Sequence, residues 1–476
     1  MRPDDESGHS IRARRRFLSS CGVGLGQLAA ASLLGRPATA GARAPSDPRA
    51  PHFAPRAKAV IQLFMGGAPS QLDLFDPKPT LTKYEGEPLP PSVIGDQRYA
   101  FILPDAAVLG PRFRFARHGS SGAELASPWR HLAGVADELC IVRSMHTDQF
   151  NHAPAQLLLN SGFSQPGRPS MGSWAAYGLG AESRDLPAYV AMVTGSGISA
   201  GAALWSSGFL PKDHAGVRLR NGKDPILNLT TPASFDAPGM QRETFALLAR
   251  LDRERADALG SPDFEERMRS LEMAATLQTS APELLDLRSE GQATLDLYGC
   301  EPDKASFARA CLLARRLVER GVRFVSIFHE GWDAHSDVKG STERNCRATD
   351  RACAALIRDL KPRGMLDDTL VVWGGEFGRT PMVETNPALG RSQGRDHHPQ
   401  AFTMWLAGGG ARAGYTHGET DDFGFHITRD PVHVHDLQAT ILHLLGMNHE
   451  RLTYRHAGRD FRLTDVHGRV VRELLS

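Results

Sequence analysis

Short, continuous apolar runs alternate along this chain with longer segments in which apolar residues recur every three or four positions. The runs at 59–65, 322–328 and 368–373 are typical of strands buried on both faces of a parallel sheet. Amphipathic helical patterns occupy 306–321, directly before a strand, and 435–446 near the end of the chain. This alternation predicts an α/β fold, with a mainly parallel central sheet sandwiched between helices.

The segment 240–320 is predominantly helical by the same criterion. Residues 240–278 carry apolar side chains at three- and four-residue spacing with charged residues opposite them, and Gly260-Ser261-Pro262 interrupts the pattern. These features predict two helices separated by a break. The segment fits either a cap over the edge of the sheet or part of one helical face.

Carboxylate and imidazole groups gather at the ends of the expected strands. Asp333 and His335 follow the run at 322–328, and Glu376 follows the run at 368–373. Open α/β sheets bind ligands at the carboxyl ends of their strands, and oxygen and nitrogen ligands suit a divalent metal ion. We therefore expect a metal site at this edge. Any one of these residues, taken alone, is better explained by capping or ion pairing in a surface loop.

The segment 395–399 carries the densest group of such residues. Asp396, His397 and His398 lie there, just before an apolar run at 401–407. Adjacent histidines in an extended loop point in different directions, so we expect one of the two to be a direct metal ligand. The other would donate a proton or support a ligand.

Three further residues are candidates for catalysis. Asn151 and His152 open a short helix predicted at 152–162, whose amide groups could bind an oxyanion. The alternative is an ordinary N-terminal turn. Arg379 could bind an anionic substrate oxygen through its planar guanidinium, and the alternative is a surface ion pair.

Composition narrows the possible partners. The chain has 476 residues, of which 41% are hydrophobic, and a formal net charge of +1. This length supports a large core, and the near-neutral charge favours neither nucleic acid nor an anionic membrane surface as a partner. The cysteines after residue 40 are odd in number and scattered, so we expect buried, unpaired thiols rather than a disulfide framework.

The N-terminal region has the pattern of an export signal. Arg14-Arg15-Arg16-Phe17-Leu18 fits a twin-arginine motif, a mildly apolar run follows, and Ala38-Thr39-Ala40 fits a cleavage site. We expect a signal peptide at 1–40, a Pro/Ala/Arg-rich linker with nothing to bury at 41–57, and one α/β domain at 58–476. The mature protein would have no membrane span and would be periplasmic or extracellular. A retained N-terminal anchor is the alternative.

Several motifs of seven or more residues resemble those of one known family. They include GGAPSQLDLFDPKP, GWDAHSD, GEFGRTP and the run from GRDHHPQAFTMWLAGGG to VHVHDLQATILHLLG. Together, in this order, they closely resemble the bacterial DUF1501 family from about residue 58 onward. The resemblance implies the fold of the alkaline phosphatase and sulfatase superfamily, export from the cytoplasm, and metal-assisted hydrolysis of a sulfate or phosphate ester.

The chain departs from that superfamily at the reacting groups. Sulfatases carry their nucleophile in a Cys/Ser-x-Pro-x-Arg motif, but here His152 stands in that frame and Gln156 replaces the arginine. The first strand ends in two glycines where the superfamily has a metal-binding aspartate, and the nearest acids are Asp73 and Asp76. Glu376 and a phenylalanine replace Asp-His. The usual mechanism therefore cannot be transferred whole.

The sequence supports two hypotheses about function. The favoured one is an exported hydrolase of a small-molecule or polysaccharide sulfate or phosphate ester, with one or two divalent ions (Ca, Mn or Zn). Either His152 or a water activated by the metal would be its nucleophile. The other hypothesis is a non-catalytic member that binds a glycan or a partner protein. The candidate metal ligands are Asp73, Asp333, His335, Glu376, Asp396, His397 and His398.

Overall fold

The computed structural model describes residues 49–476, except 98, 100–101, 104, 196, 223–224, 227–239, 260–261 and 387–388. All of them belong to the second of the chain's two compact units, Pro45–Ser476. The predicted signal peptide and the first part of the predicted linker lie outside the described residues. None of the described helices combines the length and hydrophobicity that a membrane span requires.

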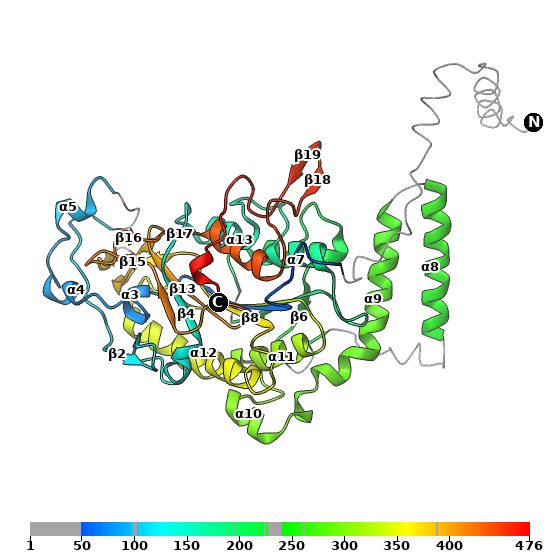
Figure 1. Cartoon of the computed structure of the whole chain (residues 1–476), viewed down its shortest axis with the longest axis horizontal. Helices are drawn as coiled ribbons and strands as arrows, with labels where there is room; N and C mark the ends of the chain where they lie inside the picture. Colours follow the sequence, from blue (N-terminus) through cyan, green and yellow to red (C-terminus); the bar gives the residue numbers. More distant parts are fainter. Residues whose placement is uncertain are drawn as a thin grey trace, which may run out of the picture. The chain divides into compact units, whose positions relative to one another are not determined.

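A nine-stranded sheet forms the centre of the molecule (Figure 1). Its order is β14-β4-β13-β8-β1-β7-β5-β6, with β17 also paired to β4. The strands are β1 (Ala59–Gly66), β4 (Leu139–His146), β5 (Tyr189–Thr194), β6 (Val217–Leu219), β7 (Phe324–Glu330), β8 (Thr369–Gly374), β13 (Phe402–Ala407), β14 (Tyr415–His417) and β17 (Val432–His433). The expected α/β fold with a mainly parallel sheet is confirmed.

One strand of the large sheet runs against the others. β13 is antiparallel to both of its neighbours, β8 and β4, whereas the other pairs are parallel. The first residues of β13 therefore lie at the same edge as the last residues of β8 and β4. For this reason a segment that precedes a strand, 395–399, reaches the edge where the other candidate residues follow their strands.

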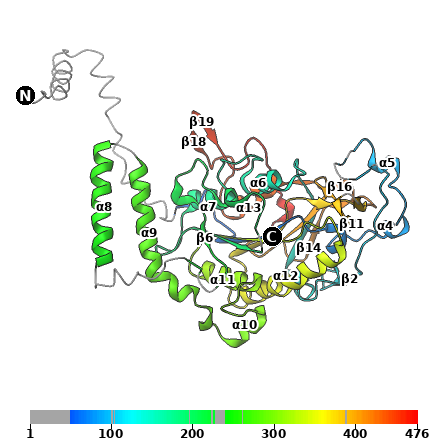
Figure 2. The same ribbon diagram turned by 180° about the vertical axis from the view of Figure 1, so that it is seen from behind.

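Helices cover both faces of the sheet (Figures 1 and 2). In β1, Ile61 and Leu63 belong to one core cluster, which includes residues of α10, α11 and α12. Val60 and Phe64 belong to the other cluster, with residues of α6, α7 and α13. The helices are α6 (His152–Ser161), α7 (Met171–Leu179), α10 (Gln292–Tyr298), α11 (Phe307–Glu319), α12 (Val338–Leu360) and α13 (Val434–Leu444).

Short elements complete the fold. Three small helices follow β1, and strands of two to four residues form separate two-stranded sheets outside the large one. They are α3 (Gln71–Leu74), α4 (Pro79–Lys83), α5 (Pro91–Ile94), β2 (Phe115–His118) with β3 (Ala123–Ala126), β9 (Gly378–Arg379) with β12 (His397–His398), β10 (Glu384–Asn386) with β11 (Arg391–Gly394), β15 (Glu419–Thr420) with β16 (Ile427–Arg429), and β18 (Tyr454–His456) with β19 (Arg459–Phe461).

The predicted helical pair is present as α8 (Met240–Leu259) and α9 (Pro262–Leu285). α9 packs mainly against α8, α11 and the short helix at Lys212–His214, and Arg269 pairs with Asp213 at 2.8 Å. Of the two expected placements, the structure therefore favours a flank of the helical layer over a cap.

Residues 49–57 do not form the free linker that the sequence predicted. The Arg49 guanidinium donates to the carbonyl of Tyr177 at 2.6 Å, and the amide of His52 donates to the carbonyl of Gly446 at 2.9 Å. Ala57 is fully buried. This segment is low in hydrophobic residues, but its backbone and arginine bind to the body of the domain. The five cysteines of the described residues are buried and unpaired, as predicted.

Candidate metal centre

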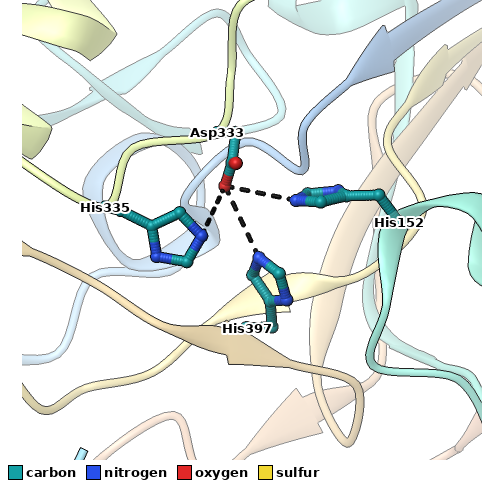
Figure 3. A group of neighbouring side chains, drawn as sticks. All are labelled: His152, Asp333, His335 and His397. Atoms are coloured by element: carbon teal, nitrogen blue, oxygen red, sulfur yellow. Dashed lines mark ion pairs between the residues drawn. The ribbon is translucent and has the colours of Figure 1, made fainter. Parts of the chain in front are cut away.

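Four candidate residues converge at the carboxyl edge of the sheet (Figure 3). His152 is the first residue of α6, Asp333 and His335 lie in the loop after β7, and His397 lies on β12 just before β13. Each offers one ligand atom, and these atoms lie within 4.8 Å of one another. We call these four residues the metal cluster.

One oxygen atom is the centre of this cluster. Asp333 Oδ1 lies 3.2 Å from His152 Nε2, 3.0 Å from His335 Nε2 and 3.5 Å from His397 Nε2. The guanidinium of Arg379 donates to the same oxygen at 2.6 Å. The backbone of Asp333 lies close to Gly67, which has a φ of 103°. Only glycine fits there, because a Cβ atom on Gly67 would lie 2.4 Å from the amide nitrogen of Asp333.

The other ring nitrogen of each histidine is held by a separate acceptor. His152 Nδ1 bonds to Glu376 Oε1 at 2.7 Å, His335 Nδ1 bonds to Glu384, and His397 Nδ1 bonds to the carbonyl of Phe150 at 2.7 Å. An acceptor at Nδ1 keeps a proton there, so in the neutral ring Nε2 is the nitrogen left to bind a metal ion. This outer set of carboxylates and carbonyls is the usual support of metal-binding histidines.

Glu376 lies beneath the cluster as the support of His152. Its carboxylate also accepts hydrogen bonds from the amide of Gly67 at 3.0 Å and from Gln156 Nε2 at 3.0 Å. The side chain is fully buried. Phe377 packs beside the rings of His152 and His397, with centroids 5.0 and 4.6 Å away. The amide of Gly67 and the side chain of Gln156 thus position one carboxylate.

The pKa values of several groups in the cluster are strongly shifted. Burial lowers the pKa of His152, but contacts with Asp333 and Glu376 outweigh burial and raise it to about 9. Burial also opposes the shift at Asp333, yet the three imidazoles and Arg379 hold its pKa far below the ordinary value. For His397, burial dominates and lowers the pKa to about 4. His397 is therefore neutral and ready to donate a lone pair.

The donor set fits a divalent cation. Nε2 of His152 and Nε2 of His397 are buried and lack hydrogen-bond partners of good geometry, although both point at Asp333. Buried polar atoms are rarely left in this state. Three imidazole nitrogens and one carboxylate oxygen form a ligand set used by zinc and other borderline cations.

Glu384, which the sequence analysis did not identify, also lies at this edge. It starts β10, is fully buried, and bonds to both His335 and Arg391. With His335 and Asp396 it forms a second group of possible ligands. Asp396 accepts a hydrogen bond from the amide of His397 at 2.8 Å. No apolar strand precedes Glu384, so no sequence signal marked it.

Three predicted ligands have other partners. Both ring nitrogens of His398 are used, by Tyr99 at 2.9 Å and by the carbonyl of Phe425 at 2.7 Å. His398 therefore faces away from the cluster. Asp73 is fully buried and pairs with Arg395 at 2.8 Å, also outside the cluster. Glu376 reaches the centre only through His152.

The three residues predicted to be catalytic have different surroundings. Arg379 is fully buried and donates to Asp333 and to the carbonyls of Gly67, Ala68 and Arg395. These bonds occupy Nε and both terminal nitrogens, so Arg379 is a structural partner rather than a substrate ligand. Asn151 is the exposed N-cap of α6, without a side-chain capping bond. His152 stands among the possible metal ligands.

Some solved structures are similar to this chain at low levels. The lipoteichoic acid synthase LtaP from Listeria monocytogenes aligns over 87% of this chain and 76% of its own, with 11% identity and a TM-score of 0.37. The PsFucS1 sulfatase from Pseudoalteromonas sp. aligns over 83% of this chain and 69% of its own, with 13% identity and a TM-score of 0.35. Alkaline phosphatase from the Antarctic bacterium TAB5 aligns over 83% of this chain and 99% of its own, with 10% identity and a TM-score of 0.35.

The family comparison is specific. No curated protein matched the sequence. A family model described as "Protein of unknown function (DUF1501)" matches residues 57–475, which include every residue of the metal cluster. The chain therefore belongs to the DUF1501 family.

Proposed function

We propose that the protein is a metal-dependent hydrolase of sulfate or phosphate esters, with its active site at the metal cluster. The observation that carries the proposal is the convergence of three Nε2 atoms on Asp333 while each Nδ1 is held by its own acceptor. This arrangement leaves two buried imidazole nitrogens, Nε2 of His152 and Nε2 of His397, without hydrogen bonds.

His152, Asp333, His335 and His397 would hold the ion. The nitrogen-rich set suits Zn²⁺ or Mn²⁺ better than Ca²⁺, which takes six to eight oxygen ligands. When bound, a divalent cation supplies a Lewis acid that polarises an ester oxygen and lowers the pKa of water.

The residues of the chain would keep this site in place. Glu376 orients His152 through Nδ1, and Glu384 orients His335 in the same way. Arg379 forms an ion pair with Asp333 and offsets part of its negative charge. Phe377 packs against the rings of His152 and His397. The position of His152 makes it a ligand in this proposal, so the attacking group would be water rather than a side chain.

We also propose that residues 1–40 direct export through the twin-arginine route, on the basis of the motif at 14–18. A metal-loaded protein is suited to a route that carries folded proteins. The site would then work outside the cytoplasm on small-molecule or polysaccharide esters.

Metal analysis combined with an ester panel tests the proposed function. Protein purified without chelators should hold at least one divalent ion per chain, and p-nitrophenyl sulfate or phosphate should be hydrolysed with added Zn²⁺ or Mn²⁺. Asp333→Ala should lower turnover roughly 10²-fold or more, whereas His456→Ala, on the distant β18–β19 hairpin, should not. A wild-type protein without metal would refute the proposal. Metal binding without hydrolysis of any ester would favour the alternative, a non-catalytic member that binds a glycan or partner protein.

A further inference from the structure

The metal cluster is surrounded by several carboxylates, whose negative charge its own cationic groups only partly balance. Carboxylates of Asp333, Glu376, Glu384 and Asp396 lie in or directly beneath it, and the last three are buried. An anionic ester approaching this edge meets that negative charge. A single divalent ion offsets part of it, so recognition of an anion calls for a further cationic group that a ligand can reach.

Arg379 cannot be that group. Its side chain is 0% exposed, and its donors are directed at Asp333 and at three backbone carbonyls. A guanidinium with these partners cannot turn toward a ligand without breaking several buried hydrogen bonds.

Arg391 is the other guanidinium in contact with the metal cluster among the described residues. Its Nη1 lies 2.5 Å from Glu384 Oε1 and 3.4 Å from Nδ1 of His335. The side chain is 25% exposed, whereas Glu384 is 0% exposed. One imidazole ring therefore separates this guanidinium from the point where the Nε2 atoms converge.

The backbone around Arg391 is tied to the loop that carries the ligands. Arg391 pairs with Asn386 across the β10–β11 hairpin. The amide of Asp337 donates to the carbonyl of Ser392 at 3.0 Å, and the amide of Arg395 donates to the carbonyl of Ala334 at 3.1 Å. The position of the guanidinium relative to His335 is thus set by main-chain bonds as well as by Glu384.

We propose that Arg391 binds the anionic group of the substrate, a sulfate or phosphate oxygen, and so makes the site selective for charged esters. This inference rests on the proposed function. A planar guanidinium is suited to tetrahedral oxyanions because it donates two parallel hydrogen bonds. An anionic group that lies beside the His335 ring, next to the metal position, would be bound by the Arg391 guanidinium, whereas a neutral ester would gain nothing from that charge.

Two variants separate this role from mere support of Glu384. Arg391→Gln removes the charge. Arg391→Lys keeps a charge that can pair with Glu384, but the lysine side chain lacks the two parallel N–H donors of a guanidinium. With metal-loaded protein, kcat/KM for p-nitrophenyl phosphate and sulfate should fall roughly tenfold or more in Arg391→Gln. The kcat/KM for neutral p-nitrophenyl acetate should change less than about twofold, and the metal content should be unchanged. Arg391→Lys should recover part of the loss. Equal losses on charged and neutral esters, or loss of metal, would overturn the proposal.

Anion binding gives a readout independent of turnover. Calorimetry should show that metal-loaded wild-type protein binds inorganic phosphate or sulfate about tenfold more tightly than Arg391→Gln. Arg344→Gln is the matched control, because Arg344 lies on α12 nearby and pairs with Asp337 at 3.6 Å, outside the cluster. If the control weakens binding equally, the effect is general charge and the proposal fails. If no ester is hydrolysed but anion binding depends on Arg391, the anion site stands and the proposed hydrolase function falls.

Discussion

His152 Nε2 lies 3.2 Å from Asp333 Oδ1, although one residue begins α6 and the other follows β7. The same histidine bonds through Nδ1 to the buried Glu376. A ring held between two carboxylates is a site for either a proton or a metal ion. The predictions below follow from this arrangement and from the neighbours of the cluster.

Adjacent histidines should have separable effects. His397→Ala removes a ligand of the cluster, so metal content or affinity should fall while the melting temperature changes little. His398→Ala removes a buried ring with two hydrogen bonds, so the free energy of unfolding should fall by about 2 kcal/mol or more, with metal still bound by the folded protein. Elemental analysis and thermal unfolding of both variants test this, and identical behaviour of the two would contradict it.

The outer acceptors should tune metal affinity. Glu376→Gln and Glu384→Gln keep the side-chain shape but weaken the acceptors at Nδ1 of His152 and His335. We expect a 10- to 100-fold loss of affinity for Zn²⁺ in each, roughly the effect seen when such supporting groups are changed. Competition with a chromogenic chelator measures it. Unchanged affinity in both variants would show that the imidazoles need no support.

Metal binding should release a proton and strengthen with pH. Burial lowers the pKa of His152, but contacts with Asp333 and Glu376 raise it to about 9. In metal-free protein at about pH 7 the ring is therefore protonated, and a cation must displace that proton. Affinity should rise from about pH 6 to about pH 8. Calorimetry in buffers of different ionisation enthalpy should detect about one released proton per ion, and a flat pH dependence would count against this account.

The buried pair of Asp73 and Arg395 should matter for stability rather than metal binding. Both side chains are 0% exposed and lie 2.8 Å apart. Asp73→Ala leaves the guanidinium buried without its partner, which should cost about 3–5 kcal/mol of unfolding free energy. Asp368→Ala, which breaks the exposed pair with Lys58, is the control and should cost less than about 1 kcal/mol. Equal costs from urea unfolding would contradict this view.

Export should depend on the arginine pair at the N-terminus. Changing Arg14 and Arg15 to Lys should hold the precursor in the cytoplasm, as expected for a twin-arginine signal. Cell fractionation and sequencing of the N-terminus test it. Normal export of the double variant would refute the signal, and an exported protein that still includes residues before Ala40 would indicate a retained anchor.

The sequence by itself determined the strands and helices and the edge at which the chemistry gathers. The apolar runs that became β1, β7 and β8 are local signals of burial, and Asp333, His335 and Glu376 follow two of them directly. The end of α6 was also readable, because the expected glycine stop at Gly162 is its C-cap, in the left-handed conformation with φ of 68°. These features depend on neighbours along the chain.

The tertiary structure alone decided which side chains meet. The antiparallel direction of β13 brings His397 to the ligand edge, and partners far away in sequence hold His398 apart from it. The burial of Arg379 and the position of Glu384 depend on contacts between segments that sequence periodicity does not relate. A side chain's role depends on the direction in which it points and on the atoms already bound to it, and both are set only when distant segments pack together.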